Sequence, residues 1–309
     1  MEGPGISRQR VPLDVFISSS GVPKPTVSIA EVPVSNALVL IADISSFRQT
    51  AQVHKVVFKE GPLLWAEVAK SPFRAKVVMP VGRHSLNATV HYGDGHFSDG
   101  APIEFEIKPP DIAPWELSRI DDTERSYGAH LDDKGESLTL LGDGLLFATQ
   151  SVHGDFVLTA QVPFIGNATG RPANPLGHSA GLMIRSTRTC KSWAFNSFNA
   201  TGSYSFIEYD MYYKGHLFSS TEPDVTGGKL WNEAAFPLVI GQWMRLSRIG
   251  NDLSFFSSPD GKEWKFIRTI HDDKMPVDAY VGPFLYKLPN PTIFSLRADF
   301  EHLKLESVK

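Results

Sequence analysis

Apolar and polar residues alternate at every second position over several stretches of this chain. Residues 154–164 read GDFVLTAQVPF, and residues 241–270 contain three further runs of this kind. Alternate side chains of a strand point to the same face, so this period predicts strands that pack on one side. Gly250-Asn251-Asp252 and Pro259-Asp260-Gly261 separate the three runs. Glycine and asparagine tolerate positive φ and proline presets the first turn residue, so both interruptions predict hairpin turns in an antiparallel sheet.

The same pattern continues through the first third of the chain. It predicts strands over 26–32, 37–44, 53–59, 63–68, 73–79, 82–92 and 103–107. About seven short strands separated by turn residues are what an immunoglobulin-like sandwich requires. The 22 prolines and 25 glycines lie between short apolar runs, which also favours strands over long helices.

The length of the chain, 309 residues, exceeds what one hydrophobic core usually serves. Pro109 and Pro110 remove two successive backbone donors, so no strand is expected to run through them. We therefore expect three segments. Residues 1–24 form a linker or N-terminal extension, residues 25–110 an Ig-like sandwich, and residues 111–309 a second β domain.

Three motifs of the second domain carry a resemblance. They are SAGLMIRS at 179–186, W-x-R-L-x-R at 243–248 and S-x-D-G-x-x-W at 258–264. This part of the chain, over 112–306, resembles the concanavalin A-like jelly rolls of the LamG-like kind that accompany bacterial glycoside hydrolases. Residues 53–108 are similar to bacterial Ig-like domains of such enzymes. The resemblance implies an all-β protein, an Ig-like sandwich followed by a concanavalin A-like jelly roll. Such sandwiches include lectins, hydrolases, lyases and spacers, so fold alone does not decide function.

Charge and composition exclude few functions. The formal net charge of −4 and the absence of a Lys/Arg cluster give no electrostatic footprint for nucleic acid. No apolar run approaches the ~18–20 residues that span a bilayer. Cys190 is the single cysteine, so no internal disulfide is expected.

The first residues, MEGPGISRQR, lack the apolar core of a signal peptide. Because domains of the resembled kinds are usually exported, we expect an extracellular or cell-surface protein, with a cytoplasmic one as the alternative.

Two carboxylates lie in the segment SYSFIEYDMYYKG at 203–215. If this segment is a strand, Glu208 and Asp210 share a face about 6.5–7 Å apart. A pair of carboxylates beside aromatic rings is what a retaining glycosidase uses. Laminarinase-type enzymes carry a similar E-x-D-x-E strand, but here Tyr212 and Tyr213 follow where a third carboxylate would stand. A glycoside hydrolase or polysaccharide lyase that uses Glu208 and Asp210 is therefore the alternative function.

The aromatic residues around this segment favour binding without catalysis. Sugars lay apolar C–H faces on aromatic rings, while polar side chains hold their hydroxyls. The predicted stacking rings are those of Trp193, Tyr212, Tyr213 and Trp231. The predicted hydroxyl ligands are Arg185, Glu208 and Asp210. Core packing of each ring, and a purely structural or adhesive surface module, remain the alternatives.

No cofactor is expected, since the chain contains no G-x-G-x-x-G motif or P-loop. Its histidines also lack the close spacing of a zinc site. A structural calcium ion would fit a jelly roll of the resembled superfamily, and Asp155 and Asp299 are its candidate ligands. The expected partner is a polysaccharide or other glycan.

Overall fold

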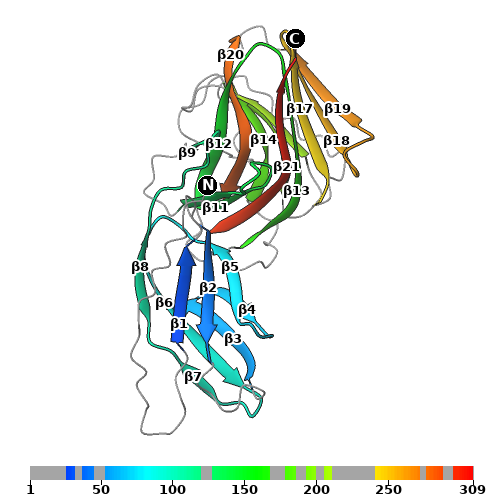
Figure 1. Cartoon of the computed structure of the whole chain (residues 1–309). Helices are drawn as coiled ribbons and strands as arrows, with labels where there is room; N and C mark the ends of the chain where they lie inside the picture. The colour runs from blue at the N-terminus through cyan, green and yellow to red at the C-terminus, as the bar shows by residue number, and fades with distance from the viewer. Residues whose placement is uncertain are drawn as a thin grey trace, which may run out of the picture. The chain divides into compact units, whose positions relative to one another are not determined.

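A computed structural model describes most of the chain (Figure 1). The described residues are 26–31, 37–44, 53–119, 127–167, 178–185, 193–199, 205–210, 241–271, 276–287 and 295–308. Within these ranges the regular structure is entirely β-strand, so the predicted all-β fold is confirmed. None of the described residues forms a helix long and apolar enough to cross a membrane. The chain divides into two compact units, 1–110 and 111–309. The linker or extension expected over 1–24 lies outside the described residues.

The described residues of the first unit form two sheets. A three-stranded sheet has the order β1 (Thr26–Glu31), β2 (Ala37–Asp43), β5 (Arg74–Val78). The second sheet has the order β4 (Leu63–Val68), β3 (Val53–Glu60), β6 (Gly82–Tyr92), β7 (Phe97–Asp99), and β8 (Ile103–Ile107) also pairs with β6. Both sheets contribute fully buried side chains, Leu40 from the first and Phe58 and Leu86 from the second. The Ig-like assignment of this β-sandwich stays a prediction.

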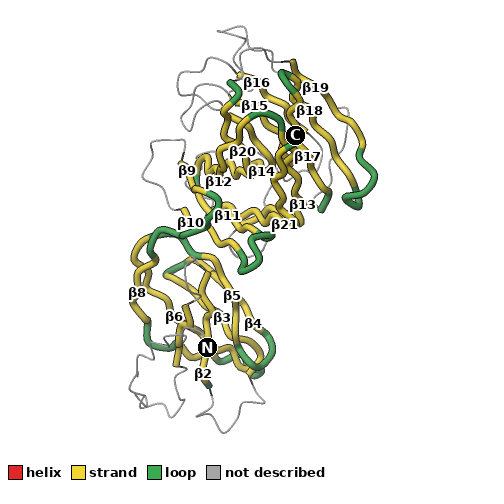
Figure 2. The backbone as a smooth tube through the Cα atoms, turned by 45° about the horizontal axis from the view of Figure 1, so that its top comes forward, coloured by secondary structure: helices red, strands yellow, loops and turns green. Residues whose placement is uncertain are grey.

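The described residues of the second unit form two larger sheets (Figure 2). The seven-stranded sheet has the order β10 (Tyr127–Leu131), β11 (Leu138–Gly142), β21 (Leu296–Ser307), β13 (Phe156–Asn167), β17 (Trp243–Ile249), β18 (Asp252–Ser258), β19 (Lys265–His271). The six-stranded sheet has the order β16 (Ser205–Asp210), β15 (Trp193–Asn199), β14 (His178–Arg185), β20 (Asp278–Lys287), β12 (Gly144–His153), β9 (Glu116–Arg119).

One hydrophobic core joins these two sheets. Leu158, Leu246 and Phe255 enter it from the seven-stranded sheet, and Leu182 and Val281 from the six-stranded sheet. All five side chains have no exposed surface. Leu158, Leu246 and Phe255 belong to the apolar half of an alternating strand, so the face of the sheet that carries them must be covered. By contrast, β14 and β20 are buried on both faces over 180–185 and 281–286. The alternation predicted for 154–164 and 241–256 is confirmed.

Both predicted hairpin turns of 241–270 are present. Gly250 lies between β17 and β18 with φ +59°, and Gly261 lies between β18 and β19 with φ +74°. Only glycine adopts such angles without steric cost. The turns thus bring three consecutive strands into one antiparallel sheet edge, in which Arg245 pairs with Phe256 and Phe256 with Phe266.

Candidate functional site

The structure brings three of the residues predicted from sequence into one row. In the register of the six-stranded sheet, Arg185 of β14 pairs with Trp193 of β15, and Trp193 pairs with Asp210 of β16. Glu208 occupies the next row of β16, opposite Phe195. Figure 2 shows these strands at one end of the sheet. The other three predicted residues, Tyr212, Tyr213 and Trp231, lie outside the described residues.

Arg185 is deeply buried, with 1% of its surface exposed. It lies on the face of β14 opposite Leu182 and Ile184, which enter the core. Met183 on this same outward face, and Phe284 on β20, are also fully buried. Direct contact between Arg185 and a sugar therefore stays a prediction, and an accessible site among the described residues is found on the other sheet.

A group of rings and one guanidinium lies on the outward face of the seven-stranded sheet. We call it the outer cluster. Its members are Trp243 and Arg245 of β17, Phe256 of β18, Trp264 of the turn before β19, Phe266 of β19, and His302 of β21. Trp243 and Arg245 alternate with the buried Met244 and Leu246, and hence point away from the core. Phe266 is 53% exposed, which is unusual for a ring of this size.

Arg245, Phe256 and Phe266 of the outer cluster lie in one row of the sheet, which crosses the neighbouring strands β21, β13, β17, β18 and β19 (Figure 1). Lys304 of β21 pairs with Thr159 of β13, and Thr159 pairs with Arg245 of β17. The row then continues through Phe256 to Phe266. At about 4.8 Å between strands, these five positions span roughly 19 Å, and the three that belong to the outer cluster span roughly 10 Å.

Trp243 is held from two directions. The His302 ring lies parallel to it, with centroids 4.8 Å apart and an angle of 13° between the planes. His302 has φ +53°, and the register between β13 and β21 shifts beside it, where a β-bulge changes the direction of a side chain. The backbone at Gly261 also passes so close that a Cβ there would lie 2.7 Å from Cε2 of Trp243. These contacts fix the position of Trp243 beneath the turn.

The turn at 258–264 is organised by one carboxylate. Asp260 Oδ1 accepts hydrogen bonds from the backbone N–H groups of Lys262 (2.9 Å) and Glu263 (3.0 Å) and from the hydroxyl of Ser258 (3.0 Å). The two backbone hydrogen bonds lower the pKa of Asp260, because they stabilise its charged form. Asp260 therefore has a structural function, which is to shape the turn that leads to Trp264.

Trp264 lies against Arg245. The guanidinium carbon of Arg245 is 3.8 Å from the centre of the indole ring, within the range of a cation–π interaction. The Nε atom of Arg245 is buried and has no hydrogen-bond partner. Burial lowers the pKa of Arg245, and the opposing field of Glu306 is the smaller effect. The outer cluster thus combines aromatic surface with an unsatisfied donor.

Sequence reasoning used Trp243, Arg245 and Trp264 only as marks of a resemblance and did not place them in a site. The W-x-R spacing on a strand, followed by a turn that ends in tryptophan, is the sequence pattern that could have indicated this cluster. His302 offered none, because its position depends on the bulge in β21.

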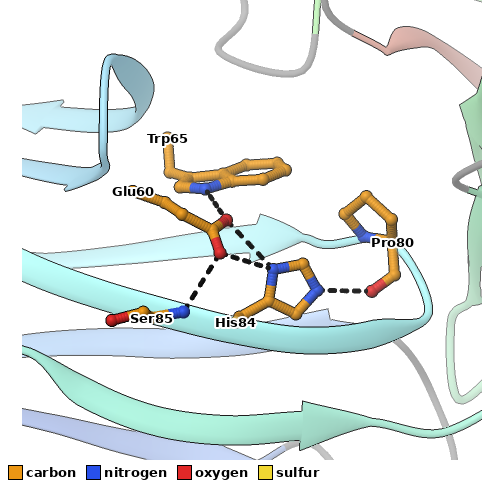
Figure 3. A network of polar contacts seen from close by, with 5 residues as sticks. All are labelled: Glu60, Trp65, Pro80, His84 and Ser85. Carbon is orange, nitrogen blue, oxygen red and sulfur yellow. Dashed lines mark hydrogen bonds and ion pairs between the residues drawn. The ribbon is translucent and has the colours of Figure 1, made fainter.

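The first unit contains a separate polar network (Figure 3). Nδ1 of His84 lies 3.0 Å from Oε2 of Glu60, and its Nε2 lies 2.8 Å from the carbonyl oxygen of Pro80. Glu60 also accepts hydrogen bonds from Nε1 of Trp65 (3.2 Å) and the backbone N–H of Ser85 (3.0 Å). Because these groups satisfy one another and His84 is 8% exposed, the network stabilises the β3–β4 turn against β6 and leaves no group for a ligand.

The two candidate calcium ligands have partners within the chain. Asp299 accepts hydrogen bonds from the hydroxyl of Thr139 (2.7 Å) and from Arg297. Asp155 accepts one from the backbone N–H of Gly250 (2.8 Å). The described residues contain no group of three or more His, Cys, Asp or Glu side chains that could hold a metal ion. The structural calcium stays a prediction without a ligand set.

Comparison with known proteins found no matching family model and no matching curated protein. Solved structures do match. A functionally unknown protein from Saccharomyces cerevisiae is 13% identical, with a TM-score of 0.41, over 64% of this chain and 99% of that one. The GH43 protein BlXynB from Bacillus licheniformis is 13% identical, with a TM-score of 0.36, over 97% and 68% of the two chains.

A third match is a lectin from Bauhinia forficata in complex with GalNAc. It is 11% identical, with a TM-score of 0.33, over 64% of this chain and 95% of that one. The matches therefore include a glycoside hydrolase family member and a lectin. Likeness at this level supports no inference about function.

Proposed function

We propose that this chain is an extracellular, non-catalytic glycan-binding protein. In this proposal the second unit, a concanavalin A-like jelly roll of the LamG-like kind, recognises the glycan, and the Ig-like first unit is a spacer. The observation that carries the proposal is the outer cluster, where the exposed ring of Phe266 and the half-buried ring of Trp264 lie beside the guanidinium of Arg245. Rings of this kind bind the C–H faces of sugars, and neighbouring polar groups bind the hydroxyls.

The position of the rings supports recognition rather than core packing. Phe266 is 53% exposed, and the rings of Phe256 and Phe266 meet edge to face with centroids 5.7 Å apart. Trp264 remains half-buried on the same face. All three lie opposite the hydrophobic core, so folding of the second unit does not require aromatic residues at these positions.

The test is a glycan array, followed by affinity electrophoresis with the polysaccharides that bind. Trp264→Ala and Phe266→Ala should each weaken binding by roughly 1–2 kcal/mol, which is about 5- to 30-fold. Ile249→Ala is the matched control, because Ile249 is 55% exposed on β17 but has no ring. Unchanged affinity in both ring variants would refute the outer cluster as the binding site.

The residues predicted from sequence are tested in parallel. Trp193→Ala, Tyr212→Ala and Trp231→Ala probe the site predicted from sequence. Loss of binding in these variants alone would keep the proposed function and move its site from the outer cluster to these residues. No binding of any glycan would favour the structural or adhesive module.

Hydrolysis remains the second candidate because Glu208 and Asp210 occupy positions two apart on β16, as their spacing predicts. A glycoside hydrolase or lyase would release reducing ends from a polysaccharide. Activity that survives Glu208→Gln would exclude this carboxylate as a catalytic group.

A further inference from the structure

Arg245 has more hydrogen-bond donors than the chain satisfies. Its five N–H groups point outward in the guanidinium plane, so stacking on Trp264 occupies the face of the group and not its donors. Among the described residues, no hydrogen bond or ion pair from Arg245 is present, and Nε is completely buried without a partner. The side chain as a whole is only half-buried. Its terminal nitrogens therefore remain available to a ligand.

A second arginine of the same sheet shows how the chain satisfies such a group elsewhere. Arg297 of β21 also lies over a ring, 5.6 Å from the centre of Phe164. It donates from Nε to Oδ1 of Asp299 at 2.9 Å and from Nη2 to Oδ2 at 2.8 Å. This is the two-point pairing that a planar guanidinium makes with a carboxylate. Arg245 has the aromatic contact of Arg297 without the carboxylate.

Glu306, the carboxylate whose charge acts on Arg245, does not pair with it. Glu306 acts on Arg245 through its field, but its Oε1 atom is 2.8 Å from Nζ of Lys304. Lys304 and Arg245 belong to the same register row, with Thr159 between them. Glu306 therefore forms its ion pair with Lys304 and not with Arg245.

We propose that the outer cluster binds an acidic glycan, and that the carboxylate of a uronic acid unit pairs with the terminal nitrogens of Arg245. The inference rests on the proposed glycan-binding function and names its ligand class. A carboxylate fits the planar fork of the guanidinium at two points. The rings of Trp264 and Phe266 then contact the apolar faces of the sugar units on either side.

The experiment measures the affinity of the whole chain for two uronate polymers, polygalacturonate and alginate. Each is compared with its carboxyl-reduced product, which keeps the linkage and loses the charge. The wild-type chain should prefer at least one acidic polymer over its reduced form. Arg245→Gln should weaken binding of that polymer on the order of tenfold or more, as expected for a charge-assisted pair, and should weaken binding of the reduced form much less.

Lys262→Gln is the matched control, since it removes the same charge from an exposed side chain of the adjacent turn. It should bind like the wild type, and thermal unfolding verifies that both variants are folded.

Equal affinity for acidic and reduced polymers, with loss of binding only in Trp264→Ala, would overturn the acidic ligand and leave glycan binding intact. If dextran sulfate binds as tightly as the uronate polymer, or if Arg245→Gln binds the uronate polymer like the wild type, the carboxylate pairing is overturned. Binding of neutral glycans alone on the array would also overturn it without refuting the proposed function.

Discussion

Replacement of Gly261 by alanine tests how the outer cluster is held. Gly261 has φ +74°, and an added Cβ would lie 2.7, 2.8 and 3.0 Å from three carbon atoms of the Trp243 ring. Gly250 in the neighbouring hairpin has φ +59°, but an added Cβ there would meet nothing within 4 Å. A left-handed conformation costs alanine about 1–2 kcal/mol at either position. At Gly261, displacement of the ring costs a further 1–3 kcal/mol or so, as in other overpacked sites.

We therefore expect Gly250→Ala to lower the free energy of unfolding by about 1–2 kcal/mol and Gly261→Ala by about 2–5 kcal/mol. Trp243 cannot move freely because His302 lies against its ring. Urea unfolding followed by tryptophan fluorescence measures both values, provided that the slope m is unchanged. Gly261→Ala should also weaken glycan binding, since it displaces a ring of the cluster.

A double-mutant cycle separates the contact from the backbone effect. In a Trp243→Leu background the clash is removed, so Gly261→Ala should cost no more than Gly250→Ala. Equal losses for the two alanine variants in the wild-type background would refute the close contact between Gly261 and Trp243.

Three further predictions concern the second unit. Arg245→Met should raise the free energy of unfolding by about 1 kcal/mol, because it removes an unsatisfied buried donor and keeps a contact with Trp264; a loss above about 2 kcal/mol in urea would contradict this. Asp260 has a lowered pKa in the folded state, so its stabilising effect is complete above the unfolded value of about 3.9 and is lost as pH falls through the folded value. The difference in free energy of unfolding between wild type and Asp260→Asn should accordingly be constant near neutral pH and shrink in acid. A difference that grows below pH ~4 would refute the stabilising effect of the charged Asp260. Gly282→Ala would place a Cβ 1.8 Å from the carbonyl oxygen of Ala148, which forces β12 and β20 apart. We therefore expect the free energy of unfolding to fall by more than about 4 kcal/mol, and wild-type stability of this variant would contradict the close packing of Gly282 against Ala148.

Local pattern was enough to predict the β-strands and their turns. The period of two in 154–164 and in 241–270 reappears as β13, β17, β18 and β19, with the predicted apolar half in the core. The glycines at 250 and 261 have the positive φ that their turns require. These features depend on residues a few positions apart, so the sequence contains all the information that determines them.

Local pattern named residues of the first candidate site, but it did not determine how the residues of either site come together. The row that joins Arg185, Trp193 and Asp210 depends on the register of three strands, and the burial of Arg185 depends on what covers the sheet. The outer cluster combines β17, the turn before β19 and a bulge of β21, which are far apart in the chain. Sequence alone thus determined which segments are strands and which way their side chains alternate. The tertiary structure decided which strands are neighbours, because sheet order and register arise from long-range packing that no local pattern records.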